Sequence, residues 1–284
     1  MTNTAKPTQV PTITLNDGTS IPQLGFGVFL VEPGETERIV TDALEAGYRH
    51  IDTAKIYGNE EGVGRAIAKS GIPRDELYIT TKLWNDDQGR ENVRPALEAS
   101  LERLALDHVD LYLIHWPTPE RGLYVETWEA MLELPATGLT TSVGVCNFLE
   151  PHLRDIISAT GTAPVVNQIE QHPYLQQPEL DAVLTEHDIR IEAWGPLAQA
   201  KTGLFDEPAV IDAARAHNKS PAQAIIRWHL QKGNIVFPKT VSRARMDENF
   251  SVLDFELTDD EFAAISLLDK GEEGRVATNP NDFN

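Results

Sequence analysis

Short apolar runs alternate along the chain with longer stretches in which apolar residues recur at helical spacing. Eight of the short runs are typical of β-strands, because β-branched and aromatic residues dominate them and polar or turn residues flank them. These strands are predicted over residues 25–29, 48–52, 77–82, 109–115, 142–147, 165–170, 189–194 and 235–239. Ahead of them, residues 12–15 and 19–21 flank an Asp17-Gly18 turn, which predicts an N-terminal hairpin.

Amphipathic helices are predicted in the intervals between these strands. Helical periodicity extends over residues 35–46, 91–105, 149–159, 178–187, 207–217 and 220–231. Gly47 follows the first of these helices, and Pro151 and Pro178 lie early in two others, where this punctuation is expected. A further helix is predicted over residues 258–268, with Thr258 as N-cap and Glu261 completing a capping box. The alternation predicts an α/β fold, a (β/α)8 TIM barrel with an N-terminal hairpin and an extra C-terminal helix.

No linker or change of composition divides the sequence. All 284 residues are therefore expected to form a single barrel domain, a size that such barrels routinely reach. Within it, residues 1–22 hold the hairpin and residues 270–284 form a polar tail. The tail is either a frayed end or a flap over the barrel mouth, and its terminal position favours fraying.

Charge and composition argue against several classes of function. Asp and Glu number 44 against 24 Lys and Arg, so a nucleic-acid partner is not expected, and the acidity is interpreted mainly as a source of solubility. No segment approaches the ~20 apolar residues that span a bilayer, and residues 1–8 lack the apolar core of a signal peptide. The single cysteine, Cys146, allows no intrachain disulfide and fits a cytoplasmic location.

Reactive side chains lie where predicted strands end. Asp52, Lys82 and His115 each close an apolar run, and Tyr57 follows Asp52 in a loop. Alone, Asp52 could cap a turn, Lys82 could form a surface ion pair and His115 could be a core histidine. In a parallel barrel, however, all strand C-termini open on one face, so these groups are expected to meet there. A neighbouring cation lowers a tyrosine pKa from about 10, which predicts a proton-donating site.

Two further patterns fall at the same face. Trp84, Trp116 and Trp194 lie at or just past strand ends, which predicts the walls of an apolar pocket. Residues 236–245 carry three basic side chains and no acid, and they lead from the eighth strand into a predicted short helix at 243–250. Loops in this place often bind phosphate at a helix N-terminus, whereas the alternative is a solvated basic loop.

Other motifs fail. Gly62-Val63-Gly64 lacks a third glycine and a preceding strand, so it is no dinucleotide fingerprint. No pattern of histidine and cysteine indicates a metal site. Cys146 has no activating partner in the sequence, which favours packing over nucleophilic catalysis.

Several long motifs resemble the aldo-keto reductase family, and the resemblance runs essentially end to end. They are GYRHIDTA at 47–54 with YGNE at 57–60, Leu106-Asp107 with VDLYLIHWP at 109–117, and FPKT at 237–240. Within the family the chain is most similar to bacterial 2,5-diketo-D-gluconate reductases, in LNDG at 15–18, residues 57–62, TKLWND at 81–86 and WGPL at 194–197.

The resemblance implies an NADPH-dependent carbonyl reductase that transfers hydride to an aldehyde or ketone, such as a 2,5-diketo-D-gluconate-like substrate or methylglyoxal. Tyr57 would be the general acid, Lys82 the cation that lowers its pKa, Asp52 the carboxylate that holds Lys82, and His115 the group that orients the carbonyl. The implied substrate pocket is lined by Phe29, Trp84, His115 and Trp116.

The resemblance also implies a cofactor site. Trp194 would stack on the nicotinamide, with Asn147 and Gln168 bonded to its carboxamide. Lys239, Thr240 and Arg245 would bind the adenosine 2′-phosphate, and Glu248 and Asn249 would lie at the adenine. The other implied cofactor contacts are Cys146, Gly195, Pro196, Leu197 and Gln199.

Two residues depart from the family pattern. Cys146 stands where serine is usual beside Asn147, which puts one hydrogen bond in question. Lys55 occupies a usually small or apolar position, where it either attracts acidic substrates or, as is favoured here, points into water.

Rival functions remain open at this stage. Lys82 could form a Schiff base in an aldolase, although a carboxylate neighbour would keep it protonated. A cofactor-binding regulatory subunit, as this fold provides on ion channels, is a second rival. A monomer without membrane or nucleic-acid partners is expected, while the sequence leaves the physiological substrate and the favoured direction open.

Overall fold

Eight parallel strands form the centre of the computed structural model, which describes residues 10–200 and 202–284. They are β3 (Phe26–Gly27), β4 (His50–Asp52), β5 (Tyr78–Leu83), β6 (Val109–Ile114), β7 (Thr140–Cys146), β8 (Val166–Glu170), β9 (Arg190–Trp194) and β10 (Ile235–Val236). Each strand pairs with the next in sequence order. A parallel bridge between Leu24 and Val236 joins the two ends of the sheet. The predicted (β/α)8 barrel is therefore confirmed.

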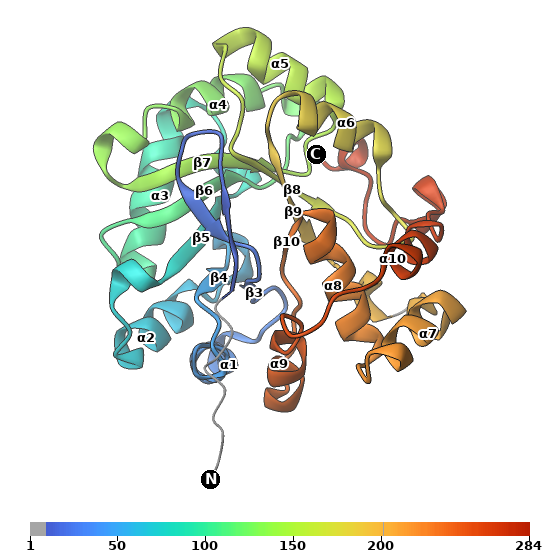
Figure 1. The fold of residues 1–284 in the computed structure, drawn as a ribbon. Helices are drawn as coiled ribbons and strands as arrows, with labels where there is room; N and C mark the ends of the chain where they lie inside the picture. Colours follow the sequence, from blue (N-terminus) through green and yellow to red (C-terminus); the bar gives the residue numbers. More distant parts are fainter. Residues whose placement is uncertain (1–9, 201) are drawn as a thin grey trace.

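Helices surround the strands (Figure 1). They are α1 (Pro33–Ala46), α2 (Glu60–Ser70), α3 (Arg90–Leu104), α4 (Tyr124–Met131), α5 (Glu150–Thr160), α6 (Pro178–Glu186), α7 (Pro208–Ala216), α8 (Pro221–Lys232), α9 (Arg243–Phe250) and α10 (Asp259–Ser266). The capping box of Thr258 and Glu261 begins α10 as predicted. Helix α2 contains Gly62 and Gly64, and a Cβ at Gly64 would lie 2.1 Å from the Leu104 carbonyl oxygen. Gly64 thus allows α2 to approach the end of α3 closely, while a Cβ at Gly62 would lie 2.7 Å from Thr36 of α1.

The predicted hairpin covers one end of the barrel (Figure 1). Strands β1 (Thr12–Thr14) and β2 (Ser20–Pro22) pair antiparallel, and Leu15 and Ile21 pack in one apolar cluster with Leu111 and Ile235 of the barrel. The expectations for residues 1–8 lie outside the described residues. No helix in the described part of the chain is long and apolar enough to cross a membrane.

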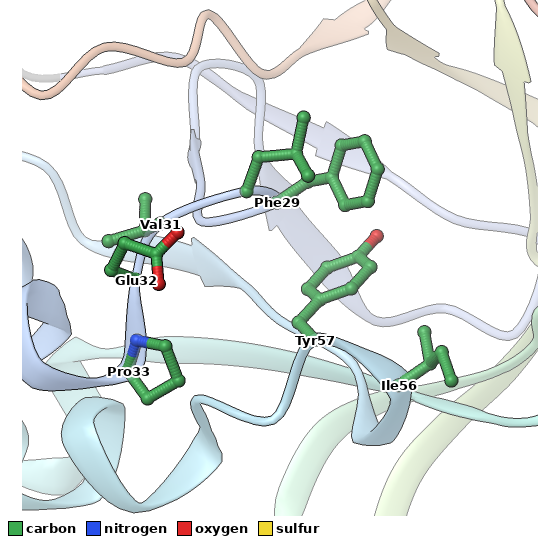
Figure 2. A pocket seen from close by; sticks show the side chains of 7 residues that line it. Phe29, Val31, Glu32, Pro33, Ile56 and Tyr57 are labelled. Atoms are coloured by element: carbon green, nitrogen blue, oxygen red, sulfur yellow. The ribbon is translucent and has the colours of Figure 1, made fainter.

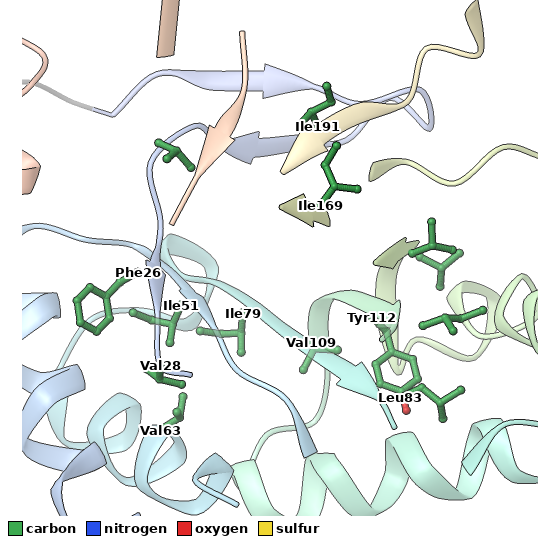
Figure 3. Packing of buried hydrophobic residues seen from close by; sticks show 14 of the residues in the cluster. Phe26, Val28, Ile51, Val63, Ile79, Leu83, Val109, Tyr112, Ile169 and Ile191 are labelled. Carbon is green, nitrogen blue, oxygen red and sulfur yellow. The ribbon is translucent and has the colours of Figure 1, made fainter. Parts of the chain in front are cut away.

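Alternation along the strands separates two kinds of interior. Ile51 of β4 and Ile79 of β5 belong to the large apolar cluster between strands and helices (Figure 3). Successive side chains of a strand point to opposite faces, so their neighbours Asp52, Thr80 and Lys82 point into the barrel. All three are buried. The barrel centre is therefore polar, and it positions charged groups beneath the mouth.

The C-terminal tail does not fray, so that expectation is wrong and the alternative of a flap is correct. Two backbone amides, from Val276 and Ala277, donate to the buried carboxylate of Glu170 at 2.7 and 3.1 Å. Near the chain end, the ring of Phe283 stacks on Trp116 with centroids 4.3 Å apart. These contacts join the tail to the mouth of the barrel.

Candidate active site

A buried ion pair lies at the centre of the site. Lys82 of β5 donates from its ammonium to Asp52 of β4, with distances of 2.6 Å to Oδ1 and 2.7 Å to Oδ2. Its third hydrogen bond, of 2.9 Å, goes to the carbonyl oxygen of Thr53. The Lys82 side chain is fully buried, so all three ammonium protons are satisfied inside the protein.

This pairing keeps Lys82 charged. Burial alone would lower the pKa of Lys82, but Asp52 and Tyr57 raise it well above its ordinary value. A Schiff-base nucleophile must be a neutral amine, so the geometry disfavours the aldolase alternative.

Tyr57 ends a 3₁₀ turn, Lys55–Tyr57, that follows β4. Gly58 continues the turn with a φ of 66°, a left-handed conformation that costs glycine little. The Lys82 ammonium lies 5.2 Å from the centre of the Tyr57 ring, and the His115 ring centre lies 5.7 Å away. The tetrad of Asp52, Tyr57, Lys82 and His115 is thus brought together.

One expectation about Tyr57 needs correction. Burial, the largest effect, raises the pKa of Tyr57 above its ordinary value, and Lys82 only opposes this rise. Asp52 adds to the rise, because its charge offsets that of Lys82. In this structure Tyr57 is therefore a protonated phenol at neutral pH rather than an acidified one.

His115 follows β6 and is neutral. Burial and the nearby charge of Lys82 both lower the pKa of His115 well below its ordinary value. Asn147 donates a hydrogen bond of 2.9 Å to the His115 backbone carbonyl, and the buried ring atom Nδ1 has no hydrogen-bond partner among residues 10–200 and 202–284. A neutral imidazole offers one donor and one acceptor nitrogen, which suits a hydrogen bond with a substrate oxygen.

Aromatic side chains surround the tetrad. The ring centres of Phe29 and Tyr57 lie 5.0 Å apart, and Figure 2 shows the two rings side by side. Both line a pocket of about 210 Å³. Trp84 packs edge-on against His115 at 5.3 Å. Phe283 covers Trp116 and also approaches Trp84 at 6.3 Å. The predicted apolar walls are therefore present, and the tail adds one more.

The predicted nicotinamide contacts cluster beside the ion pair. Trp194, which ends β9, donates from Nε1 to Asn147 Oδ1 at 3.0 Å. Gln168 of β8 uses both N–H bonds inside the barrel, with its Nε2 at 2.9 Å from Asp52 and 3.0 Å from Glu192. Within the described part of the chain, its Oε1 accepts only from the thiol of Cys146, at 3.8 Å. A thiol is a weak donor, so this oxygen keeps acceptor capacity for a ligand amide.

Cys146 is buried at the end of β7. Burial raises the pKa of the Cys146 thiol well above its ordinary value, and Lys82 opposes this only in part. The thiol is therefore protonated and unreactive, as a packing role requires.

The basic stretch lies between β10 and the start of α9. Arg243 is paired with Glu45 at 2.9 Å and Asp247 at 3.2 Å, so its charge is locally compensated. Lys239 and Arg245 are exposed, and no ion pair to either is found among the described residues. Lys239 approaches only the carbonyl of Leu30, at 3.4 Å.

The remaining predicted cofactor residues border the same region. Thr240 is buried and accepts the backbone N–H of Ser242, the N-cap of α9. In α9, Asn249 is buried, and Glu248 accepts a hydrogen bond from Ser220. Residues Gly195, Pro196, Leu197 and Gln199 form the loop that leaves β9.

Lys55 does not simply point into water, so that expectation is wrong. It forms an ion pair with Asp87, and both side chains are half-buried. The pair connects the turn that carries Tyr57 to the segment that follows β5. Its charge is compensated, which also weakens the idea that Lys55 attracts acidic substrates.

Sequence reasoning missed Phe283, Asp87 and Glu192. Phe283 is a single aromatic in an otherwise polar tail, which was an available signal. Asp87 and Glu192 gave no such signal, because their partners lie far away in the sequence. Glu192 is the buried carboxylate bonded to Gln168.

A barrel with a buried lysine–carboxylate pair beside a tyrosine and a histidine has the form of a reductase. A model of the aldo/keto reductase family matches residues 23–270. The methylglyoxal reductase DkgA of Yersinia pestis is 53% identical over 276 residues, which cover 97% of this chain and 98% of that protein. The chain belongs to the aldo-keto reductase family, and the resemblance seen in its motifs is confirmed.

Solved structures agree with this assignment. An aldo/keto reductase from Brucella melitensis has a TM-score of 0.88 at 51% identity, covering 92% of this chain and all of that one. A mutant of Gox0644 in complex with NADPH has a TM-score of 0.91 at 43% identity, covering 96% of this chain and 98% of that one.

Proposed function

We propose that this chain reduces small aldehydes or ketones by hydride transfer from NADPH, with Tyr57 as the proton donor. The single observation that carries the proposal is the buried Lys82–Asp52 pair beneath the Tyr57 ring. Such a pair places a fixed positive charge where a phenol loses its proton, which is where preorganised charge accelerates a reaction most.

The residues present fit NADPH. Lys239 and Arg245 are exposed cations near the N-terminus of α9 for which the described residues provide no acidic partner, and the 2′-phosphate is the group that would need them. Trp194 offers an aromatic face near the ion pair, and Gln168 Oε1 and Asn147 Oδ1 offer acceptors for a carboxamide. NADPH, when bound, supplies the hydride for the carbonyl carbon.

The protein's own groups handle the proton. As negative charge develops on the carbonyl oxygen, Tyr57 donates its phenolic proton to it. The Lys82 ammonium stabilises the phenolate that remains, and neutral His115 orients the carbonyl by a hydrogen bond. The aromatic walls exclude water, which strengthens both interactions.

The raised pKa of Tyr57 supports this assignment. A donor must hold its proton until the carbonyl oxygen becomes basic, and a partly buried phenol with a raised pKa does so across the neutral range. The ion pair then supplies stabilisation only as charge appears, which is what lowers a barrier.

The proposed substrates are small dicarbonyls such as methylglyoxal, or sugar-derived ketones of the 2,5-diketo-D-gluconate kind. The relative from Yersinia pestis carries the name methylglyoxal reductase, and this chain covers 98% of it. The tail narrows the mouth by placing Phe283 on Trp116, which favours compact substrates.

Steady-state oxidation of NADPH with a panel of carbonyl compounds tests this function. We expect turnover with methylglyoxal and other small dicarbonyls, and much weaker turnover with NADH. Tight NADPH binding without turnover of any carbonyl would favour the regulatory-subunit alternative instead. We further propose that the whole chain acts as one monomeric barrel domain in the reducing cytoplasm, which its single cysteine fits.

A further inference from the structure

Glu192 is a buried carboxylic acid in the barrel to which the proposed reaction gives no role. It lies on β9, two residues before Trp194, and is fully buried. Its register partners are Gln168 on β8 and Ile235 on β10. It therefore lies inside the barrel beneath the mouth, beside the ion pair.

A short chain of hydrogen bonds connects Glu192 to Lys82. Gln168 Nε2 donates to Glu192 Oε2 at 3.0 Å and to Asp52 Oδ2 at 2.9 Å. The same Asp52 oxygen accepts from the Lys82 ammonium at 2.7 Å. One amide nitrogen thus bridges two carboxyl groups, and among the residues that the structure describes only Asp52 has a cationic partner.

The other oxygen of Glu192 indicates which of its two protonation states the barrel favours. Oε1 is buried and has no hydrogen-bond partner among the described residues. A buried carboxylate with a bare oxygen carries a charge that nothing there compensates, which costs far more than a neutral carboxyl group in the same place. Burial, and then the charge of Asp52, raise the pKa of Glu192 to about 8, which agrees with a neutral group.

We propose that Glu192, kept neutral in the barrel, is a positioning residue that lets Lys82 present its charge to Tyr57, and that its ionisation weakens reduction. This inference rests on the proposed function. When Glu192 is neutral, the positive charge of Lys82 and the negative charge of Asp52 cancel. When Glu192 is ionised, these three groups together carry one net negative charge.

The surrounding groups leave that charge without compensation. The titratable side chains that act on Glu192 or respond to it are Asp52 of β4, Tyr78 and Lys82 of β5, and Cys146 of β7. Lys82 is the only cation among them, and it is fully bonded to Asp52 and Thr53. Ionised Glu192 would therefore raise the pKa of Tyr57 further and make it a poorer donor.

The first test is the pH profile of kcat with NADPH and methylglyoxal for wild type and Glu192→Gln. We expect wild-type kcat to fall by about three- to tenfold between about pH 6.5 and about pH 9.5, because ionisation of Glu192 should raise the pKa of Tyr57 by roughly one unit. The Glu192→Gln enzyme, whose amide cannot ionise, should keep its kcat across that range. KM for methylglyoxal should change little in either enzyme, because the hydrogen bond that Glu192 accepts comes from Gln168 and not from a residue assigned to the substrate pocket. An unchanged alkaline fall in the variant would overturn the proposal.

A matched control distinguishes the effect of removing the Glu192 charge from the effect of disturbing the packing around a buried carboxylate. Glu60 is also a buried carboxylate, but it lies in α2, paired with Arg103 at 2.6 Å and bonded to Thr81. Glu60→Gln should lower stability and leave the alkaline fall of kcat in place. If Glu60→Gln removed the fall as well, a general packing defect would explain both variants, and the proposal would be wrong.

Infrared spectroscopy tests the protonation of Glu192 without any turnover. Wild type should show the carbonyl stretch of a buried neutral carboxyl group at about pH 6, lost as the pH rises through about 8 and absent from Glu192→Gln. Absence of that band at about pH 6 in wild type would overturn the proposal even if the variant does not fold. If Tyr57 were not the proton donor, this band would still be present. Failure of the proposed function can therefore be distinguished from failure of the proposal about Glu192.

Discussion

The Lys82 side chain is fully buried, and its three hydrogen bonds keep its ammonium charged and in place. Asp52 therefore does more than neutralise a cation, because it also decides how much of the Lys82 field reaches Tyr57. Burial is the largest cause of the raised pKa of Tyr57, and because Asp52 offsets the charge of Lys82, the ammonium 5.2 Å from the ring does not reverse that rise. The reactive state of the phenol is set by three groups together.

Cys146 provides a prediction at the same scale. Cys146→Ser should be tolerated, with kcat near that of wild type and KM for NADPH unchanged or slightly lower. The reason is that a hydroxyl is a better donor than a thiol to Gln168 Oε1. Steady-state kinetics of the variant measures this. Complete loss of activity, or inactivation of wild type by a thiol reagent despite bound cofactor, would point to a reactive thiol instead.

At the scale of elements, two short segments hold most of the residues that are proposed to act on the substrate or to select the cofactor. The turn that presents Tyr57 is tied to the segment after β5 by Lys55 and Asp87. The loop after β10 and the first turn of α9 present Lys239 and Arg245, while Arg243 between them is neutralised by Glu45 and Asp247. Only two of the three basic side chains are therefore free to meet a phosphate.

The second of these segments predicts cofactor choice. Replacing Lys239 and Arg245 together with Met should weaken NADPH far more than NADH. Charge-assisted hydrogen bonds to phosphate contribute about 1.5–3 kcal/mol each, so two of them give a preference on the order of 10² in Kd. Titration against tryptophan fluorescence measures both affinities, and raised salt should act in the same direction. Arg243→Met is the matched control, with little expected effect. Equal NADH and NADPH affinity in wild type would show that the segment is only a solvated loop.

For the whole molecule, buried neutral histidines predict sensitivity to acid. Burial lowers the pKa of both His50 and His229 to about 3. The unfolded chain binds these protons near pH 6.5, so the stabilisation is complete above that pH and is lost as the pH falls toward 3. Each such proton costs about 1.4 kcal/mol per pH unit in this window.

Urea unfolding between about pH 6.5 and about pH 4.5 measures this slope. His229→Gln should reduce the loss of unfolding free energy with falling pH by about one such proton. A slope unchanged by His229→Gln would contradict the assignment of a buried neutral imidazole.

Local patterns in the sequence sufficed for the barrel and its tetrad, because strands and the side chains at their ends are encoded within a few residues. Contacts between distant segments were not readable in this way. The tail anchor of Glu170 joins residues 106 and 107 positions apart, and Lys55 meets Asp87 across 32 positions. Glu192 lies in an apolar run without punctuation, and only the register of β8 and β9 shows that it faces Gln168.

The central claim is that Tyr57 donates the proton in an NADPH-dependent carbonyl reduction. Its most direct test is single-turnover kinetics of Tyr57→Phe with NADPH and methylglyoxal, with NADPH affinity measured by tryptophan fluorescence on the same sample. The account predicts a rate lower by about 10²–10⁴, the usual contribution of a positioned acid, with NADPH affinity nearly unchanged. A Tyr57→Phe enzyme that binds NADPH and reduces methylglyoxal at close to the wild-type rate would contradict it.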